Sequence, residues 1–416
     1  MRSFLPLLVR EWRLLLFGFL MAFGSSYGQT FFIALFSADI RDSLQLSHSG
    51  FGLLYSAATL ASAAVLLWSG SLIDRWDLRW VSYAVVAGLG AACVLASLAK
   101  GPLMLFLGLL LLRHMGQALM SMTGLTSVVR YIPEDRGKAS AIATSGFAVA
   151  EALLPLMAVA LLAILDWRQS FLVWGILLMA SMPPLIWWLL QGHDRRHADY
   201  IDTLRYDRHR SQHDDTAPRR QWTRRDMLRD PLLYLFLPAL LAQPLLFTGF
   251  MFHQVQLVIE KGWELSFWAQ LYVLYAITSS VCKFGAGLLI DRFGAQPLLP
   301  YIIWPLGAGL FLLAIASAQW TAVVFMLLIG ISTGLYTTTS SPFFAERYGT
   351  LHLGAIKSVT TAIMVCATAV TPVAMGWALD AGVTLGDMAI GAALYVLLAS
   401  AAAAVGCHRD KRLRTW

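Results

Sequence analysis

Long runs of apolar residues alternate with short polar stretches along most of the chain, and this pattern predicts membrane-spanning helices. A helix needs about 20 predominantly apolar residues to cross the hydrocarbon core of a bilayer. Twelve segments meet this requirement: 12–35, 49–73, 80–98, 102–128, 139–164, 170–191, 231–257, 268–290, 297–318, 320–344, 354–378 and 385–407. The pattern therefore predicts an all-α membrane protein with twelve transmembrane helices.

One long polar segment, His193 to Asp230, separates the sixth predicted helix from the seventh. It is rich in arginine and aspartate and cannot be buried in lipid. Its histidines alternate with arginines, which disfavour a divalent cation, so we expect a solvated linker and no metal site. We predict an N-terminal six-helix bundle (1–191), a charged cytoplasmic linker (192–230) and a C-terminal six-helix bundle (231–416).

Composition supports a lipid environment for most of the chain. Hydrophobic residues make up 58% of the sequence and charged residues 13%, and the mean hydropathy is +0.65. A soluble domain carries about 25% charge. The net charge of +7 would suggest nucleic-acid binding in a soluble protein. Here the basic residues lie in loops, so they indicate membrane topology and we expect no nucleic-acid partner.

The distribution of lysine and arginine predicts the orientation. With the N-terminus inside, the outer loops hold only Arg41, Lys100, Arg168 and Lys261 of the 31 basic residues. Most of the others fall in the tails and inner loops, as the positive-inside rule requires of cytoplasmic segments. We therefore predict a multi-pass protein of the plasma (inner) membrane with both termini in the cytoplasm. The first apolar run is long and is followed by others, so we expect a spanning helix there and no cleavable signal.

A short charged motif occurs twice at the same place in the two halves. Gly70 to Arg75 reads G-S-L-I-D-R after the second predicted helix, and Gly287 to Arg292 reads G-L-L-I-D-R after the eighth. The two aspartates are 291 − 74 = 217 residues apart, close to half of the chain. The repeat predicts two related halves.

With these two copies, the P-E-D-R-G-K-A turn from Pro133 and the E-R-Y-G turn from Glu346, the chain resembles the major facilitator superfamily. The resemblance implies two pseudo-symmetric bundles that rock around a central site, so that access alternates between the membrane faces. It also implies that the charged turns hold the inner face closed in one state. The alternative is that these charges only anchor helix ends. The gating residues it implies are Gly70, Asp74, Arg75, Arg136, Gly287, Asp291, Arg292, Glu346 and Arg347.

Two ionisable residues fall deep in the membrane in neighbouring helices. Arg113 and Glu151 each lie about 16–18 Å into antiparallel helices, at 1.5 Å per residue. A buried charge is expensive, so a mutual ion pair is the natural interpretation. The pair could be purely structural. Alternatively, Glu151 could accept a proton when substrate draws Arg113 away, which would couple transport to a proton gradient.

Lys283 is a cation within the eighth predicted helix and has no acid at its own depth in the second half. Its place four residues before the motif glycine looks like that of the substrate-binding arginine in monocarboxylate and oxalate–formate porters. That resemblance implies an anion site, although a lysine offers a point charge in place of a bidentate fork. The alternative is a lysine that extends to the headgroups.

Further polar residues are expected to line a wet cavity with these cations. They are Tyr27, Gln29, Gln117, Tyr336 and Gln254, and each could instead form only an interhelical hydrogen bond. His253 is a weaker candidate for proton coupling, because its place near the outer end could leave it solvated.

These features predict a secondary transporter for a small, monocarboxylate-like organic anion, coupled to protons and working by alternating access. A proton-driven antiporter that exports drugs or metabolites is the first alternative. An enzyme or a receptor is the second, but neither clustered catalytic side chains nor a substantial extramembrane domain is evident. We expect no enzymatic activity, no cofactor and a monomer in the bilayer whose other partners are substrate and protons.

Overall fold

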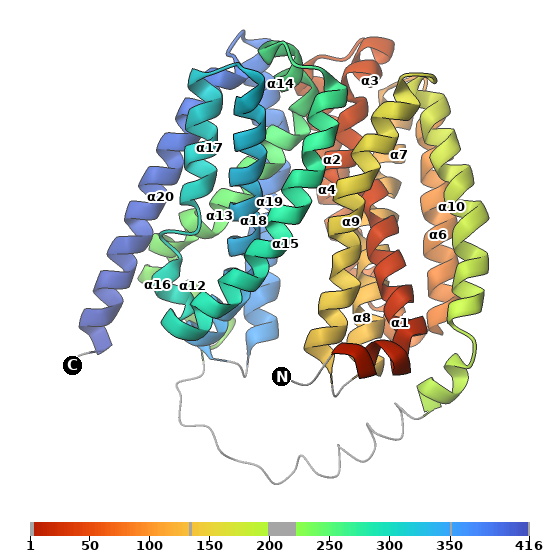
Figure 1. The fold of residues 1–416 in the computed structure, drawn as a ribbon, viewed down its shortest axis with the longest axis horizontal. Helices are drawn as coiled ribbons and strands as arrows, with labels where there is room; N and C mark the ends of the chain where they lie inside the picture. The colour runs from red at the N-terminus through yellow and green to blue at the C-terminus, as the bar shows by residue number, and fades with distance from the viewer. Residues whose placement is uncertain (1–3, 133–134, 199–221, 350–351, 415–416) are drawn as a thin grey trace. The chain divides into compact units, whose positions relative to one another are not determined.

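Every regular element in the described part of the chain is helical (Figure 1). The computed structural model describes residues 4–132, 135–198, 222–349 and 352–414. Ten helices within these ranges are long and apolar enough to cross a membrane. They are His48–Ser69, Leu78–Ser97, Pro102–Tyr131, Arg136–Leu162, Trp167–Leu189, Pro231–Phe252, Leu265–Phe293, Gln319–Tyr348, Ala355–Asp380 and Leu385–Asp410. Each coincides with a predicted span, which confirms the all-α membrane character.

The other two predicted spans are not single long helices. The first is divided into α1 (Phe4–Ser25), η1 (Ser26–Gly28), α2 (Thr30–Ile33), η2 (Ala34–Phe36) and α3 (Ser37–Leu44). The ninth contains only α17 (Trp304–Ile315). Pro305 lies in the first turn of α17, where its missing N–H costs nothing, so the helix begins there. Breaks in the helical structure therefore interrupt two of the twelve predicted spans, 12–35 and 297–318.

Contacts between helices divide the chain into two compact units, each described by itself. Unit 1 comprises Met1–Ile33, Ala57–Glu151 and Leu161–Pro218, and unit 2 comprises Ala34–Ser56, Ala152–Ala160 and Arg219–Trp416. Two long helices, α4 (His48–Ser69) and α9 (Arg136–Leu162), contribute to both units. The predicted bundle boundaries at the linker stay a prediction.

Unit 1 is a bundle in which small residues allow close packing. Besides α1 it contains α5 (Leu72–Arg75), α6 (Leu78–Ser97), α7 (Pro102–Leu111), η3 (Leu112–Met120), α8 (Ser121–Tyr131) and α10 (Trp167–Leu189). A Cβ on Gly175 of α10 would lie 3.3 Å from the carbonyl oxygen of Gly90 in α6. Glycine at this contact lets the two backbones approach closely, as is common between membrane helices.

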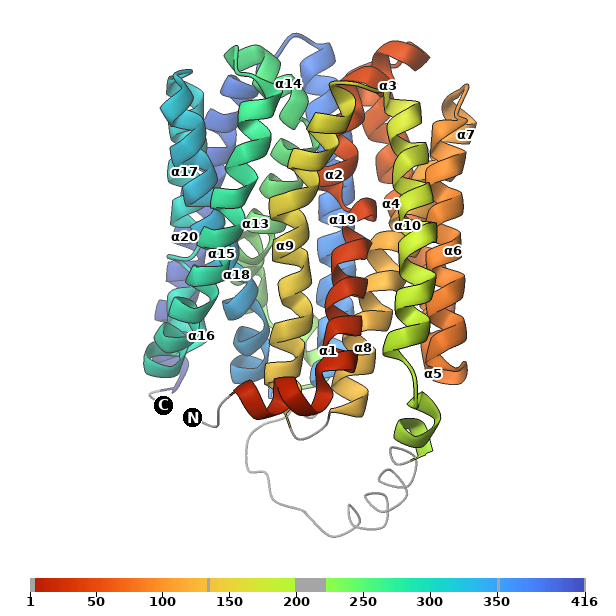
Figure 2. The same cartoon turned by 45° about the vertical axis from the view of Figure 1, so that its right-hand side comes forward.

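The segment after α10, residues 190–198, stabilises one end of unit 1. Asp194 accepts hydrogen bonds from Arg79 at the start of α6, and Arg196 forms an ion pair with Glu11 at 3.2 Å. Helix α1 is kinked at Glu11, where φ is −118° and ψ is 19°. Figure 2 shows the first turns of α1 lying across the direction of the rest of the helix. This end is therefore held by ion pairs between helices that are distant in sequence.

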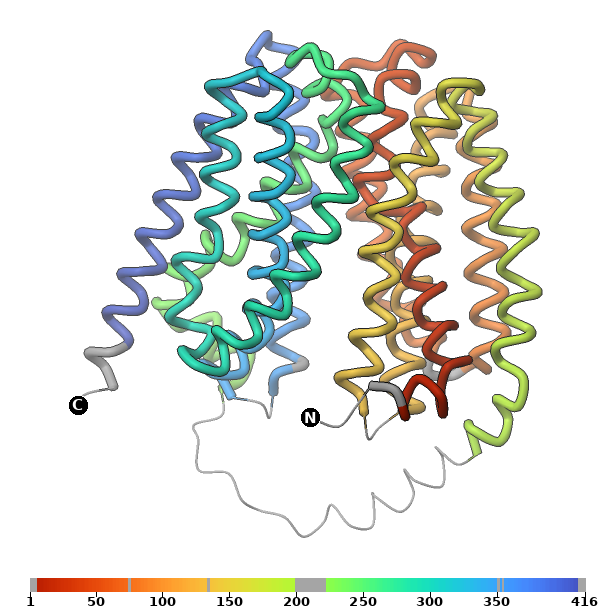
Figure 3. The backbone as a smooth tube through the Cα atoms, viewed as in Figure 1, coloured from red at the N-terminus to blue at the C-terminus, as the bar shows by residue number. Residues whose placement is uncertain are grey.

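Unit 2 is built around a long helix pair. From Arg219 onward it contains α12 (Arg224–Leu228), α13 (Pro231–Phe252), α14 (Gln254–Lys261), α15 (Leu265–Phe293), α16 (Ala295–Leu298), α17, α18 (Gln319–Tyr348), α19 (Leu353–Asp380) and α20 (Leu385–Arg414). Helices α15 and α18 run side by side (Figure 3). A Cβ on Gly330 would lie 3.0 Å from the Tyr275 carbonyl oxygen, and one on Gly334 would lie 2.6 Å from that of Ser279. Gly330 and Gly334, four residues apart on α18, therefore allow the two helices to pack closely.

Candidate functional site

The first membrane helix is interrupted at Ser26–Gly28, inside unit 1. This stretch is a single 3₁₀ turn, and Gln29 after it is extended, with φ −82° and ψ 153°. The local sequence favours the break, because glycine and serine are weak helix formers and the Ser25 hydroxyl bonds back to the carbonyl of Ala22 at 2.7 Å. A break in a membrane helix frees backbone groups that lipid cannot satisfy.

The helix that faces this break is itself irregular. Between α7 and α8 the chain forms a π-helix, η3 (Leu112–Met120), and such wide turns occur often at functional sites. Gly28 touches η3 so closely that a Cβ on it would lie 2.2 Å from the carbonyl oxygen of Leu112. A Cβ on Gly116 would lie 2.9 Å from the Gly28 nitrogen. Two glycines therefore allow the broken segment and the π-helix to make backbone contact.

Arg113 lies on η3 and binds the broken segment. Its side chain is buried, with Nη1 donating to the Gly28 carbonyl at 3.1 Å and Nε donating to Thr59 Oγ1 of α4 at 3.1 Å. The guanidinium thus satisfies a carbonyl at the break. Glu151, its predicted ion-pair partner, is half-buried on α9. Their pairing stays a prediction.

The predicted binding residues of the first half gather at this break. Tyr27 is buried in η1, and Gln29 is half-buried immediately after it. Gln117 is half-buried on η3, and its backbone nitrogen would lie 2.6 Å from a Cβ on Gly28. The structure therefore brings Tyr27, Gln29, Arg113 and Gln117 into one region of unit 1.

An aromatic cluster borders the same segment. The ring of Trp174 in α10 lies 5.5 Å from that of Tyr27 and 5.7 Å from that of Phe32, centroid to centroid. Trp174 is buried, yet its indole Nε1 and the Ser26 hydroxyl have no hydrogen-bond partner in the described part of the chain. Buried polar groups without partners are uncommon, so a polar ligand atom or water would be stabilised by them.

A polar stripe on α4 completes the surroundings of η3. Besides Thr59, the hydroxyls of Ser62 and Ser69 lie 3.5 Å and 3.2 Å from the ring nitrogens of His114. Sequence reasoning gave none of these α4 residues a role. Their spacing of three and then seven residues places them on one helix face, which is the signal that could have identified them.

Lys283 lies on the packed face of α15 in unit 2. It continues the stripe of Tyr272, Ala276 and Ser279 with a helical spacing of three or four residues, and it is half-buried. The carbonyl oxygen of Lys283 is 3.5 Å from the hydroxyl of Thr338 in α18. Its ammonium has no hydrogen-bond or ion-pair partner among the residues that the structure describes. The predicted lone cation is therefore placed against α18.

A second lysine occurs near the same part of α18. The ammonium of Lys357 in α19 donates to Ser341 Oγ at 2.7 Å. Ser341 follows Thr338 by three residues, about one helical turn. Tyr336, also predicted to bind substrate, is half-buried on α18, with its hydroxyl 3.9 Å from Met364 Sδ.

Two other predicted residues of unit 2 are occupied by packing contacts. The side-chain oxygen of Gln254 accepts from the Trp268 indole at 2.9 Å and from the Tyr272 hydroxyl at 2.7 Å. His253 is buried, not solvated, with Nε2 3.0 Å from the Pro372 carbonyl and its ring 6.2 Å from that of His48. His253 therefore lies within the packing of unit 2, where α13 ends, and its role in proton coupling stays a prediction.

In the first copy of the charged motif, the backbone lies next to another helix. Arg130 Nη1 of α8 donates to the carbonyl of Ile73 at 3.1 Å. Arg136 is exposed at the start of α9. The side chains of Asp74 and Arg75 lie outside the described residues. Asp77, where the resemblance expects a glycine, caps α6, and hydrogen bonds from Arg79 hold the pKa of its carboxyl below the usual value.

In the second half, the charged side chains of the E-R-Y-G turn, Glu346 and Arg347, have hydrogen-bond or ion-pair partners within unit 2. Glu346 accepts hydrogen bonds from the backbone N–H groups of Ala295 and Gln296 at the start of α16. Arg347 forms ion pairs with Asp230 at 2.7 Å and with Asp410 at 2.9 Å. Asp291 and Arg292 are exposed. Arg347 thus ties α18 to the starts and ends of other helices, and not to Asp291.

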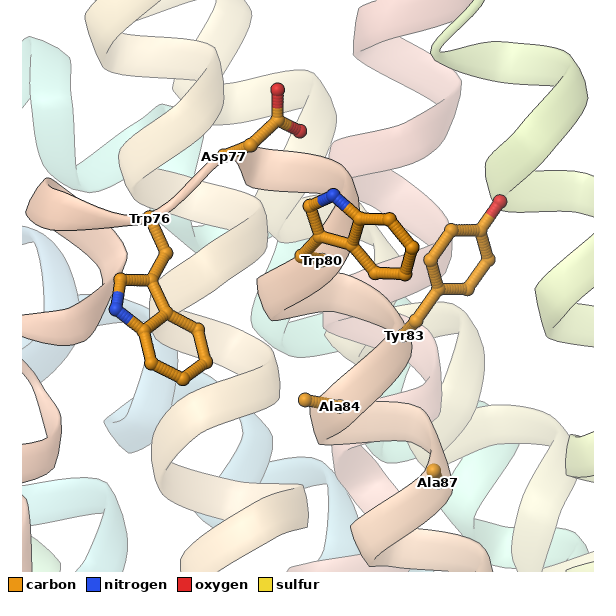
Figure 4. A pocket seen from close by; sticks show the side chains of 6 residues that line it. All are labelled: Trp76, Asp77, Trp80, Tyr83, Ala84 and Ala87. Carbon is orange, nitrogen blue, oxygen red and sulfur yellow. The ribbon is translucent and has the colours of Figure 1, made fainter.

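A shallow aromatic groove lies at the start of α6, directly after the first copy of the charged motif. Trp76, Asp77, Trp80, Tyr83, Ala84 and Ala87 line it (Figure 4). Trp76 and Trp80 are exposed, and both lie near the end of a spanning helix. Aromatic residues of this kind concentrate where membrane helices meet the water interface. The groove therefore belongs to the interfacial belt of unit 1.

Comparisons with known proteins agree with this architecture. A sequence profile described as Major Facilitator Superfamily matches residues 18–299. A Bacillus subtilis (strain 168) protein named "Uncharacterized transporter YybO" is 24% identical over 143 residues, which are 34% of this chain and 33% of that relative. The chain thus aligns with about a third of that relative's length.

Solved structures share the fold over nearly the whole chain. The nucleoside transporter NupG superposes with a TM-score of 0.69 at 14% identity, over 95% of this chain and 98% of that one. A bacterial homolog of the human lysosomal transporter Spinster gives 0.68 at 13% identity, over 95% and 97%. At these identities the likeness shows the fold alone.

Proposed function

The chain belongs to the Major Facilitator Superfamily of transporters, and from that premise we propose that it carries a small organic anion across the membrane with protons as the coupling ion. Arg113 is the observation that carries the proposal. A fixed cation at a broken membrane helix, surrounded by half-buried polar side chains, has the chemistry of an anion site.

The contacts of Arg113 explain how a substrate could act on the protein. A carboxylate accepts bidentate hydrogen bonds from a guanidinium more strongly than a neutral carbonyl does. Binding would therefore compete with the Gly28 carbonyl for Arg113, and the freed carbonyl would favour a different conformation of the η1 segment. Ligand and helix conformation are coupled in this way, as alternating access requires.

Lys283 is the candidate anion-binding cation of unit 2. Its ammonium has no partner in the described part of the chain, and an anion is one way to balance its charge. Glu151 would accept the coupling proton when substrate engages Arg113. We place both termini in the cytoplasm of a cell with the protein in its plasma membrane, on the distribution of lysine and arginine. Monocarboxylates are the first substrates to test.

An uncharged, ring-bearing metabolite is the competing substrate class. The cluster of Tyr27, Phe32 and Trp174 could stack on a ring, and the free indole N–H could donate to it. NupG, which shares the fold, is named a nucleoside transporter. In this case Arg113 would only stabilise the helix break.

Uptake by the purified protein in liposomes distinguishes an organic anion from an uncharged, ring-bearing metabolite as the substrate. We expect Arg113→Gln and Lys283→Gln each to lower pH-driven accumulation of a labelled monocarboxylate at least ten-fold, while Arg113→Lys retains part of it. Arg195→Gln, at an exposed position, is the matched charge control and should leave uptake unchanged. Undiminished carboxylate uptake in both Gln variants would reject the two cations as the anion site. Nucleoside uptake without carboxylate uptake in the parent protein would reject the anion assignment.

A further inference from the structure

The short helix α12 (Arg224–Leu228) is fixed on unit 2 just before the membrane helix α13 begins. Thr223 and Asp226 cap its start reciprocally, and Met227 is fully buried. The Trp222 N–H donates to the Tyr348 carbonyl at 3.1 Å, and the two rings lie 5.5 Å apart. The helix therefore has a fixed orientation, with Met227 toward the bundle.

The face of α12 opposite Met227 is basic. Arg224, Arg225 and Arg229 are exposed, and at 100° per residue they fall within about 140° of the helix circumference. Leu228 lies within the same arc and is 39% exposed. None of the three guanidinium groups has a hydrogen-bond or ion-pair partner in the part of the chain that the structure describes.

Three other arginines near helix ends are neutralised by acids. Arg79 pairs with Asp77 and Asp194, Arg196 with Glu11, and Arg347 with Asp230 and Asp410. The acids closest to α12 in sequence are already engaged, because Asp226 accepts hydrogen bonds from Thr223. Asp230 accepts them from Leu232, Arg347 and Tyr348. Within the part of the chain that the structure describes, no acid therefore balances the positive charge of α12.

The position of α12 indicates the kind of partner. Pro231, the first residue of a membrane-spanning helix, follows Arg229 by two residues. Tyr234 is 56% exposed, and its hydroxyl donates to the Leu228 carbonyl at 2.8 Å. Exposed tyrosine and leucine beside clustered arginines match the headgroup level of a bilayer, where tyrosine is enriched and basic clusters attract anionic lipid.

We propose that Arg224, Arg225 and Arg229 bind the headgroup phosphates of anionic phospholipids. Leu228 and Tyr234 would contact the boundary between the headgroups and the acyl chains. A guanidinium can donate two parallel hydrogen bonds to one phosphate, which favours arginine at such a surface. This proposal does not depend on the identity of the substrate.

Thermal unfolding of the purified full chain in detergent tests the proposal, with phosphatidylglycerol titrated against phosphatidylcholine. We expect phosphatidylglycerol to raise the unfolding midpoint saturably. Each basic residue near an anionic headgroup contributes roughly five-fold in affinity, so Arg224→Gln with Arg225→Gln should weaken the apparent affinity roughly 30-fold. Arg229→Gln alone should weaken it roughly five-fold.

Arg195→Gln with Arg409→Gln is the matched control, because it removes the same charge from two other exposed sites. It should change the affinity less than two-fold, and soluble glycerol phosphate should give no shift in the parent protein. Equal weakening in both double variants would mean general charge attraction and would overturn the proposal. An unchanged affinity in both the α12 double variant and Arg229→Gln would also overturn it, and so would full stabilisation by soluble glycerol phosphate.

Discussion

The guanidinium of Arg113 donates a hydrogen bond to the backbone carbonyl of Gly28 at 3.1 Å. The carbonyl lies at a break in a membrane helix. The cation lies on a π-helix that packs against this break. Each irregularity supplies what the other lacks, since lipid can satisfy neither a free carbonyl nor a bare charge. The broken helix, the π-helix and the arginine are therefore one structural unit.

Gly28→Ala should disrupt this unit. Its new Cβ would lie 2.2 Å from the Leu112 carbonyl oxygen, so η1 and η3 would have to separate. We expect a loss of about 1–3 kcal/mol in the free energy of unfolding, typical of overpacking, together with reduced uptake. The measurement is thermal unfolding in detergent and uptake in liposomes. Gly101→Ala is the control, because a Cβ there meets no atom within 4 Å. Equal behaviour of the two variants would contradict the close contact.

Arg347 should be among the most sensitive positions for stability. Its side chain is 6% exposed and pairs with Asp230, 5% exposed, and Asp410, 14% exposed. Arg347→Met would leave the buried carboxylate of Asp230 without the counter-charge of Arg347, at a cost of about 3–5 kcal/mol. Thermal unfolding or protein yield measures this loss. Arg292→Gln, at an exposed site, should cost almost nothing. A stable Arg347→Met protein would mean that the network is dispensable.

His193 should make unit 1 sensitive to acid. Burial lowers its pKa to about 4, and the positive charges of Arg79, His197 and Arg196 oppose its protonation further, while Asp77 acts in the opposite direction. The unfolded chain binds this proton near pH 6.5. The contribution of neutral His193 to the free energy of unfolding is therefore fully present above about pH 6.5. It is lost as the pH falls toward 4.

His193→Phe removes this titration and retains a ring against Tyr131, which lies 5.0 Å away, centroid to centroid. We expect the fall in unfolding temperature between pH 7 and pH 4.5 to be smaller in this variant than in the parent. His352→Phe, at an exposed position, is the control and should follow the parent curve. Identical pH curves for all three proteins would show that His193 does not titrate in this range.

Hydropathy was sufficient to predict ten of the helices that could cross the membrane, because length and apolar composition are local properties. It also identified Arg113, since a charge within an apolar run needs an explanation. The break at Ser26–Gly28 was missed because serine, tyrosine and glycine are ordinary residues in membrane helices. Nothing in the sequence indicated the π-helix that lies against Gly28.

Contacts between distant residues were the second limit of sequence reasoning. Gln254 resembled a cavity residue, but Trp268 and Tyr272 bind its side-chain oxygen. Arg347 was expected in the gating turn, and its partners Asp230 and Asp410 lie 117 and 63 residues away. Residue type and depth indicate that a polar group needs a partner, but only the packed fold identifies that partner.

Glu151→Gln tests the proposed proton coupling directly. Glutamine has nearly the same shape and cannot carry the proton, so the variant should lose pH-driven, uphill accumulation and retain exchange of labelled for unlabelled substrate. Both activities are measured in liposomes loaded with substrate, with and without a pH gradient. Glu264→Gln, at an exposed position before α15, is the control and should keep both. If uphill accumulation survives in Glu151→Gln, then Glu151 has a structural role, and the coupling proton must bind elsewhere.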